Sequence, residues 1–198
     1  VDGVESVQIT QFERQGTQWI IMDATNKPLD DVKVRQALSL ATNSKQLNEV
    51  VLKNAYFNAV SVVAPGIAGQ NPANALGFDV AKAKAALSDG GFPDGKGWPA
   101  NVKFTYNSDT QEDKLVAEAV QSMWKQNLNI DIVLEPMEGK SFDAWQQSRG
   151  NSPFFFYING WRGINVEARP GSRELFGRVR PRDINVEAVR LARAACDK

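Results

Sequence analysis

Residues 102–134 read VKFTYNSDTQEDKLVAEAVQSMWKQNLNIDIVL, and this stretch decides the fold class. Its first residues, Val102–Tyr106, have the β-branched and aromatic composition of a strand. A helix follows, with a Thr-x-x-Asp capping pattern and then an inward stripe: Thr110 and Asp113, then Val116, Val120 and Met123. A second strand follows at once, with apolar residues at alternate positions: Ile130, Ile132 and Leu134.

The same order of elements continues downstream. Phe142 and Trp145 mark a short amphipathic helix, and Pro153 leads into the apolar run Phe154–Ile158, which has the length of a strand. The order β-α-β-α-β predicts neighbouring parallel strands joined by helical crossovers. We therefore expect an α/β fold with a mixed sheet flanked by helices.

Two strands and three helices are predicted upstream. The strands are Val4–Thr10 and Thr17–Thr25, which are rich in Val, Ile and Thr. The helices are expected to begin at polar caps, namely Asp30 or Asp31, Asn43 or Ser44, and Asp79. Their inward faces follow from helical spacing: Val34, Ala37, Leu38 and Ala41; Leu47, Val50 and Val51; and Val80, Ala83 and Leu87.

The remaining stretches lack a clean period. Residues 55–77 carry several Pro and Gly residues and are expected to form a long, ordered surface loop. Between Trp161 and Asn185, six arginines stand among Gly and Pro residues, and a final helix is predicted at Val186–Cys196.

Composition excludes several classes of function. The chain has 198 residues, no histidine and one cysteine, so Ser-His-Asp and Cys-His catalysis are excluded, as are His-ligated metal sites and an internal disulfide. We expect neither a metal nor a cofactor. No apolar run approaches the roughly 20 residues of a membrane-spanning helix. No signal peptide opens the chain, so we expect any export signal to have been removed or to lie outside this stretch.

The balanced charge, 23 Lys and Arg against 23 Asp and Glu, hides two unlike parts. Residues 1–161 carry 14 basic and 18 acidic side chains, a net of −4, whereas residues 162–198 carry 9 and 5, a net of +4. The character of the chain therefore changes near Trp161.

Several motifs resemble those of one family, in the same order along residues 17–161. They are NKPLDDVKVRQAL at 26–38, FDVAKAKAAL at 78–87, NIDI at 129–132 and NGW at 159–161. Together they resemble the extracytoplasmic solute-binding proteins of peptide, dipeptide and nickel ABC importers, of the family 5 type. Members are much longer than 198 residues, so the resemblance implies one lobe, the second, of a periplasmic-binding-protein type II-like fold.

The resemblance also implies the organisation and the function. Residues 1–161 would be the ligand-binding lobe, and residues 162–198 an Arg-rich return segment with a C-terminal helix. The implied role is noncatalytic capture of a small peptide or peptide-like solute. The implied partners are a membrane ABC permease and the remaining lobe of the parent protein. The implied location is extracytoplasmic, in the periplasm or at the cell surface, where a lipoprotein would be anchored.

The candidate ligand-binding residues are Trp161, Asn159, Tyr157 and Arg162, at the end of the last predicted strand. By family analogy Trp161 would line the cleft, and the alternative is a Trp that packs in the core or at the hinge. Asn159 and Tyr157 would supply polar contacts, or be buried or act as caps. In peptide-binding relatives an Asp usually follows the Gly-Trp pair and binds the α-ammonium of the peptide, but residues 162–170 contain no Asp.

Other interpretations stay open. The Arg cluster suits an anionic ligand or a solvated segment, and nucleic acid is disfavoured because only Phe176 interrupts it. Asp30 and Asp31 are explained by helix capping, and Glu112, Asp113 and Lys114 by a solvated first turn. An enzyme or a protein-interaction module built on the same lobe is the rival function.

Overall fold

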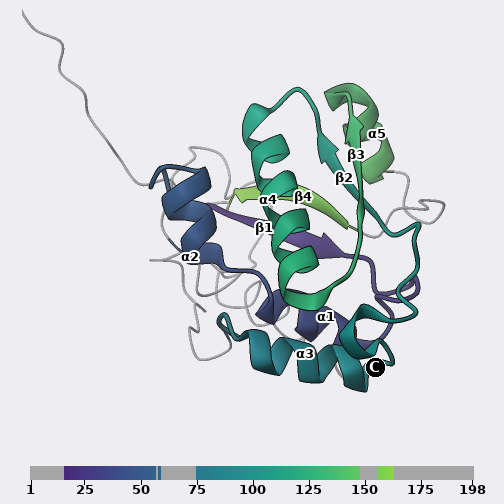
Figure 1. Cartoon of the computed structure of the whole chain (residues 1–198). Coiled ribbons are helices and arrows are strands. Elements are labelled where there is room, and N and C mark those ends of the chain that lie inside the picture. The colour runs from purple at the N-terminus through teal and green to yellow at the C-terminus, as the bar shows by residue number, and fades with distance from the viewer. Residues whose placement is uncertain (1–15, 57, 59–74, 148–155, 163–198) are drawn as a thin grey trace, which may run out of the picture.

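In the part of the chain that the structure describes, helices pack against a four-stranded mixed sheet (Figure 1). The computed structural model describes residues 16–56, 58, 75–147 and 156–162. The predicted strand Val4–Thr10, most of the predicted loop 55–77 and the predicted helix Val186–Cys196 lie outside these ranges. The predicted α/β class with a mixed sheet is confirmed.

The strand order of the sheet is β1-β4-β2-β3. The strands are β1 (Gly16–Met22), β2 (Lys103–Asn107), β3 (Val133–Met137) and β4 (Phe156–Arg162). β2 runs parallel to both β3 and β4, whereas β1 runs antiparallel to β4. The predicted strand–helix–strand unit is therefore present, with β2 and β3 side by side.

Two details of the strand prediction are wrong. β3 begins at Val133 because its partner β2 begins opposite it, at Lys103, so the buried Ile130 and Ile132 precede the ladder. β4 is also not the neighbour of β3, because the crossover through helix α5 (Gly139–Gln147) returns past β2 to its other side.

The helices begin where the polar caps predict. Asp31 is the N-cap of α1 (Val32–Leu40), and Asp79 is the N-cap of α3 (Val80–Asp89). The Asp31 carboxylate accepts a bond of 2.7 Å from the Lys33 amide, which satisfies a donor that the helix leaves unpaired. The other helical segments are α2 (Ser44–Gln46), the π-turn η1 (Leu47–Val51), the 3₁₀ turn η3 (Pro93–Gly95) and α4 (Gln111–Leu128).

The predicted burial of Val50 is wrong, because this side chain is 67% exposed. The segment that carries it closes as a π-turn, in which the Leu52 amide bonds to the Leu47 carbonyl at 2.9 Å. A π-turn spaces its residues differently from an α-helix, so Leu47 is buried while Val50, three residues later, faces solvent.

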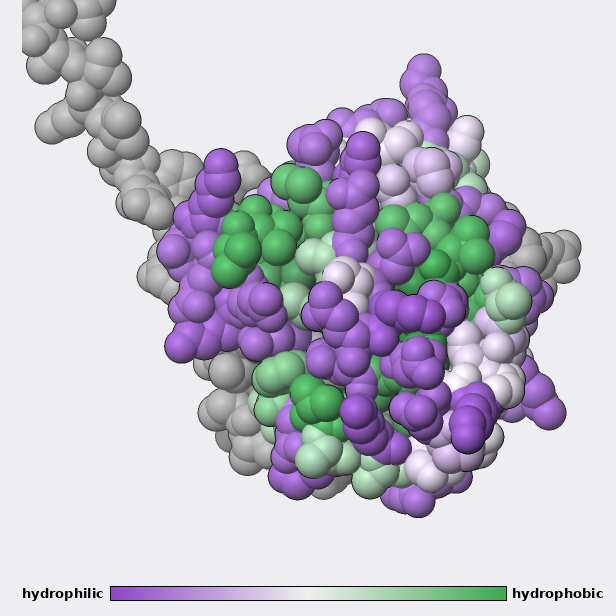
Figure 2. Space-filling model, in the orientation of Figure 1, coloured by the Kyte–Doolittle hydropathy of each residue, from purple (hydrophilic) through white to green (hydrophobic). Residues whose placement is uncertain are grey.

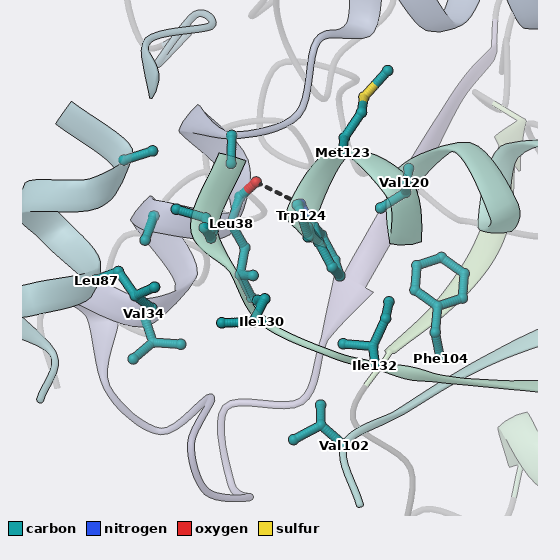
Figure 3. Close-up of a cluster of buried hydrophobic side chains, with 14 of the residues drawn as sticks. Val34, Leu38, Leu87, Val102, Phe104, Val120, Met123, Trp124, Ile130 and Ile132 are labelled. Atoms are coloured by element: carbon teal, nitrogen blue, oxygen red, sulfur yellow. Dashed lines mark hydrogen bonds between the residues drawn. The ribbon is translucent and has the colours of Figure 1, made fainter. Parts of the chain in front are cut away.

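The core is organised around Trp124 of α4, which is fully buried (Figure 3). Its indole N–H lies 3.0 Å from the Leu38 carbonyl and 2.9 Å from the Thr42 hydroxyl, at the end of α1. The Asn127 side chain donates to the Ala41 carbonyl at 2.9 Å. The last carbonyls of a helix have no partner within it, so α4 both packs against α1 and completes its C-terminus.

A hydrogen bond and a close backbone contact join the turn η3 to the end of α4. Asn129 ends α4 in the left-handed conformation, and its side-chain amide donates to the Asp94 carbonyl at 3.1 Å. Gly95 has a φ of +74°, and a Cβ at this position would overlap the Asn129 carbonyl. Glycine is therefore required here by both conformation and space.

The surface drawn in Figure 2 is largely hydrophilic, with a few separate apolar groups. Large apolar side chains exposed in the described part of the chain include Val32, Val50, Leu76, Phe78, Leu115 and Val133. Within those same residues, no helix combines the length and apolar character that crossing a membrane requires.

We expect Trp124→Phe to lower the free energy of unfolding by about 3 kcal/mol, because it removes the indole N–H shared by the Leu38 carbonyl and the Thr42 hydroxyl and leaves a smaller ring in a fully buried position. Urea unfolding measures the loss. Trp98→Phe is the matched control, since the partly buried Trp98 donates one bond, of 2.9 Å, to the Asp131 carbonyl. The control should lose about 1 kcal/mol. Equal losses in the two variants would contradict the assigned role of Trp124.

We expect Gly95→Ala to cost about 3 kcal/mol, since the new methyl group meets backbone that cannot yield and φ is positive. Gly97→Ala is the comparison, because Gly97 also has a positive φ, of +81°, but nothing lies within 4 Å of its added Cβ. Only the conformational cost of about 1 kcal/mol applies there. Thermal unfolding of both variants separates the conformational cost from the steric cost. Similar decreases in melting temperature would contradict the close contact between Gly95 and the Asn129 carbonyl.

Candidate functional site

The strand order places a topological switch point between β2 and β4. The crossover from β2 leads to β3 on one side, and the crossover from β3 returns to β4 on the other side of β2. Open α/β sheets bind ligands outside the carboxyl ends of their strands at such a point. The β2–β4 register contains two positions, Phe104 opposite Phe156 and Thr105 opposite Tyr157, although both strands continue beyond them.

The four predicted ligand-binding residues lie within β4. Trp161 and Arg162 are its last two residues, as expected, whereas Tyr157 is the second residue and lies near its beginning. Across the antiparallel pair, Tyr157 is opposite Ile21, Asn159 opposite Trp19, Trp161 opposite Thr17 and Arg162 opposite Gly16. β4 thus brings three of these residues toward the carboxyl edge of the sheet and leaves Tyr157 beside β2.

The turn after β2 is tied to the beginning of α5. The Asp109 amide donates to the Asn107 side chain at 2.9 Å, and the Gly139 amide donates to the Asp109 carboxylate at 3.0 Å. The Ser108 amide donates to the Met137 carbonyl at 2.9 Å, which joins the ends of β2 and β3. These bonds fix the carboxyl edge of the two parallel strands, and Asp109 occupies the free amide at the start of α5.

Glu112, in the first turn of α4, is the residue that the sequence interpretation missed. One carboxylate oxygen accepts a bond of 3.0 Å from the Gln18 side chain, and the other accepts a bond of 2.7 Å from the Tyr56 hydroxyl. The expected solvated first turn is therefore wrong for Glu112, which joins α4 to β1 and to the segment after η1. No local signal predicts this, because its partners lie 94 and 56 residues away in the chain.

Asp113 is only partly solvated, and it is not the cap of α4. Thr110 is the N-cap of α4, but its side chain makes no capping hydrogen bond. The Thr-x-x-Asp pattern therefore predicts correctly where the helix begins, but not a hydrogen bond from the cap. Burial raises the pKa of the half-buried Asp113 to about 6, and the neighbouring charge of Glu112 adds to the rise. Among the described residues, no group of three His, Cys, Asp or Glu side chains has an arrangement that could hold a metal ion.

A sequence profile of known proteins decides the family. The profile described as bacterial extracellular solute-binding proteins, family 5 middle, matches residues 2–179. The chain belongs to this family. The resemblance seen in the motifs at 26–38, 78–87, 129–132 and 159–161 is thereby confirmed.

Individual relatives agree with this family 5 assignment. The oligopeptide-binding protein OppA of Bacillus subtilis (strain 168) is 32% identical over 131 residues, which are 62% of this chain and 24% of OppA. The glutathione-binding protein GsiB of Salmonella choleraesuis (strain SC-B67) is 38% identical over 151 residues, which are 76% of this chain and 29% of GsiB. The chain spans between 24% and 29% of the length of these two relatives.

The structural comparison shows the same fold. The crystal structure of a periplasmic oligopeptide-binding protein (OppAIV) from Borrelia burgdorferi superposes with a TM-score of 0.66 at 30% identity, over 87% of this chain and 33% of that chain. The fold of the family 5 chain is therefore that of part of a type II periplasmic binding protein.

The shifted pKa of Asp113 predicts how Asp113→Asn changes stability with pH. Between the ordinary value of 3.8 and about 6, the native state holds this proton more tightly than the unfolded chain. The wild type therefore loses stability as pH rises through that window, and the variant does not. At pH 7 we expect a relative gain of about 1 kcal/mol, less than the full shift implies because solvent screens the group.

Chemical unfolding at a series of pH values measures this difference. Asp89→Asn, at the exposed end of α3, is the control for removing one carboxylate. The free energy of unfolding is compared between the wild type and Asp113→Asn at each pH. If the difference stays constant from pH 4 to 7, Asp113 is not desolvated.

Proposed function

We propose that the chain forms part of the ligand-binding lobe of a solute-binding protein that captures a peptide or peptide-like solute for an ABC importer, without catalysis. The observation that carries the proposal is the family match over residues 2–179, together with the switch point beside β4. The relatives support the ligand class, because their names specify oligopeptides and glutathione.

In this proposal the ligand lies at the carboxyl edge of the sheet and contacts Trp161, Asn159 and Arg162, and Tyr157, nearer the beginning of β4, contacts the part of the solute that extends furthest along the strand. The lobe comprises residues 1–161, and the Arg-rich segment 162–198 returns toward the remaining lobe of the parent protein. The two lobes close around the solute because the closed state binds it more tightly, and the closed protein delivers it to a membrane permease. The protein acts outside the cytoplasm, in the periplasm or as a lipoprotein at the cell surface.

The sequence after Trp161 limits how a peptide is held. Residues 162–170 contain Arg162, Arg169 and Glu167 but no Asp. A peptide α-ammonium therefore lacks the carboxylate that follows Gly-Trp in peptide-binding relatives. Arg162 instead offers a charge that suits the carboxylate end of a small peptide.

Calorimetric titration tests the proposal. The sample is the longest natural polypeptide that carries this sequence, and the ligands are an equimolar tripeptide library and, separately, glutathione. We expect binding of at least one of them, with Trp161→Ala weakening the affinity about tenfold through the loss of a large aromatic contact. Trp98→Phe, in the connection after α3, should leave the affinity unchanged. No binding of any peptide would refute the proposed ligand class.

A further inference from the structure

Glu112 connects three segments that are distant in the sequence. It lies in the first turn of α4 and accepts hydrogen bonds from Gln18 of β1 and from Tyr56, at 3.0 Å and 2.7 Å. Bonds to an ionised carboxylate are stronger than bonds between neutral groups. One side chain therefore holds both a strand and a loop against the start of a helix.

The bond from Gln18 reaches the strand that carries the proposed ligand contacts. Gln18 lies directly opposite Gly160 in the antiparallel β1–β4 pair, between the positions of Asn159 and Trp161. Gly160 has no side chain, so the residue directly opposite Gln18 in the β1–β4 pair offers no side-chain contact. Figure 1 shows the β1–β4 pair running across the view behind α4, while β2 and β3 rise beside it.

The other partner of Glu112 is itself held in place. The side chain of Asn48, which is 8% exposed, donates to the Tyr56 carbonyl at 2.6 Å and accepts from the Tyr56 amide at 3.2 Å. This pair of bonds fixes the backbone from which the Tyr56 hydroxyl reaches Glu112. The carboxylate is thus anchored on one side by a constrained tyrosine, and it can constrain Gln18 on the other.

We infer that Glu112 is a positioning residue for ligand binding: its carboxylate fixes β1, and through β1 the Gly160–Arg162 end of β4, relative to α4. The inference rests on the proposed function only for its effect on affinity. The effect on the strand pair stands on the geometry alone. Burial and, to a smaller extent, the charge of Glu112 raise the pKa of Asp113, so the titration of Asp113 reports independently on the Glu112 carboxylate.

Amide hydrogen exchange tests the effect on the strands without any ligand. In Glu112→Ala, we expect protection in the β1–β4 ladder to fall about tenfold, because a charge-assisted bond is lost. Glu112→Gln keeps an acceptor for Tyr56, and the Gln18 amide can turn to accept from the new amide, so protection should largely return. Glu118→Ala is the control on α4, since this exposed carboxylate lies 3.9 Å from Lys114. Unchanged protection in Glu112→Ala would refute the inference.

Calorimetry with the tripeptide library or glutathione, whichever binds the parent polypeptide, tests the functional part. We expect Glu112→Ala to weaken affinity about tenfold, Glu112→Gln to restore most of it, and Glu118→Ala to leave it unchanged. Unaltered affinity in Glu112→Ala, with the ladder loosened, would refute the positioning role in binding. If the wild-type parent binds no peptide while the ladder still loosens, the proposed function fails and the structural part of the inference stands.

The pH dependence of unfolding gives a readout that a merely structural bond would not move. Removing the Glu112 charge should lower the pKa of Asp113 in both Glu112→Ala and Glu112→Gln, because that charge opposes ionisation of its neighbour. Glu112→Gln separates the charge from the hydrogen bonds, because it should lower the pKa of Asp113 as Glu112→Ala does while largely keeping the protection of the β1–β4 ladder. An unchanged profile in both variants would show that Glu112 does not carry its charge beside Asp113.

Discussion

The junction between α1 and α4 is the contact on which the rest of the structure depends. The Trp124 indole and the Asn127 amide satisfy the Leu38 and Ala41 carbonyls at the end of α1. The Asp79 amide, just before α3, bonds to the Leu40 carbonyl at 3.0 Å. The C-terminal end of α1, whose last carbonyls have no partner within the helix, is therefore where α1, α3 and α4 meet. This junction sets the position of α4, and α4 covers β2 and β3.

The position of α4 has a consequence at the other end of that helix. The same helix that ends in the core begins beside the carboxyl edge of the sheet, where Glu112 meets β1 and Tyr56. A rigid helix of 18 residues thus connects the core to the candidate site. The proposed ligand contacts in β4 are then held from two directions, by the sheet and by the first turn of α4.

Much of the fold could be predicted from sequence because it depends on local patterns. The inward stripe of Val34, Ala37, Leu38 and Ala41 is buried in the structure, since a spacing of three and four residues defines one helix face. The exposure of Val50 could not be predicted, because a π-turn changes the spacing without any mark in the sequence.

The candidate site was harder to predict, because its geometry depends on contacts between distant segments. The family motifs at 26–38 and 159–161 led to the correct family and to the strand that ends in Trp161 and Arg162. The strand order could not be predicted, because a crossover from β3 can return to either side of the sheet. Glu112 could not be distinguished from an ordinary acidic first turn, since its partners are identified only by the folded chain.

The central proposal is that this family 5 chain binds a peptide-like solute at the carboxyl edge between β2 and β4. Backbone amide chemical shifts of the parent polypeptide, recorded with and without saturating peptide, test it most directly. The account predicts that the largest changes fall in Asn107–Thr110 and Gly160–Arg162. Changes confined to α1 and α3, with the amides of those two segments unmoved, would contradict it.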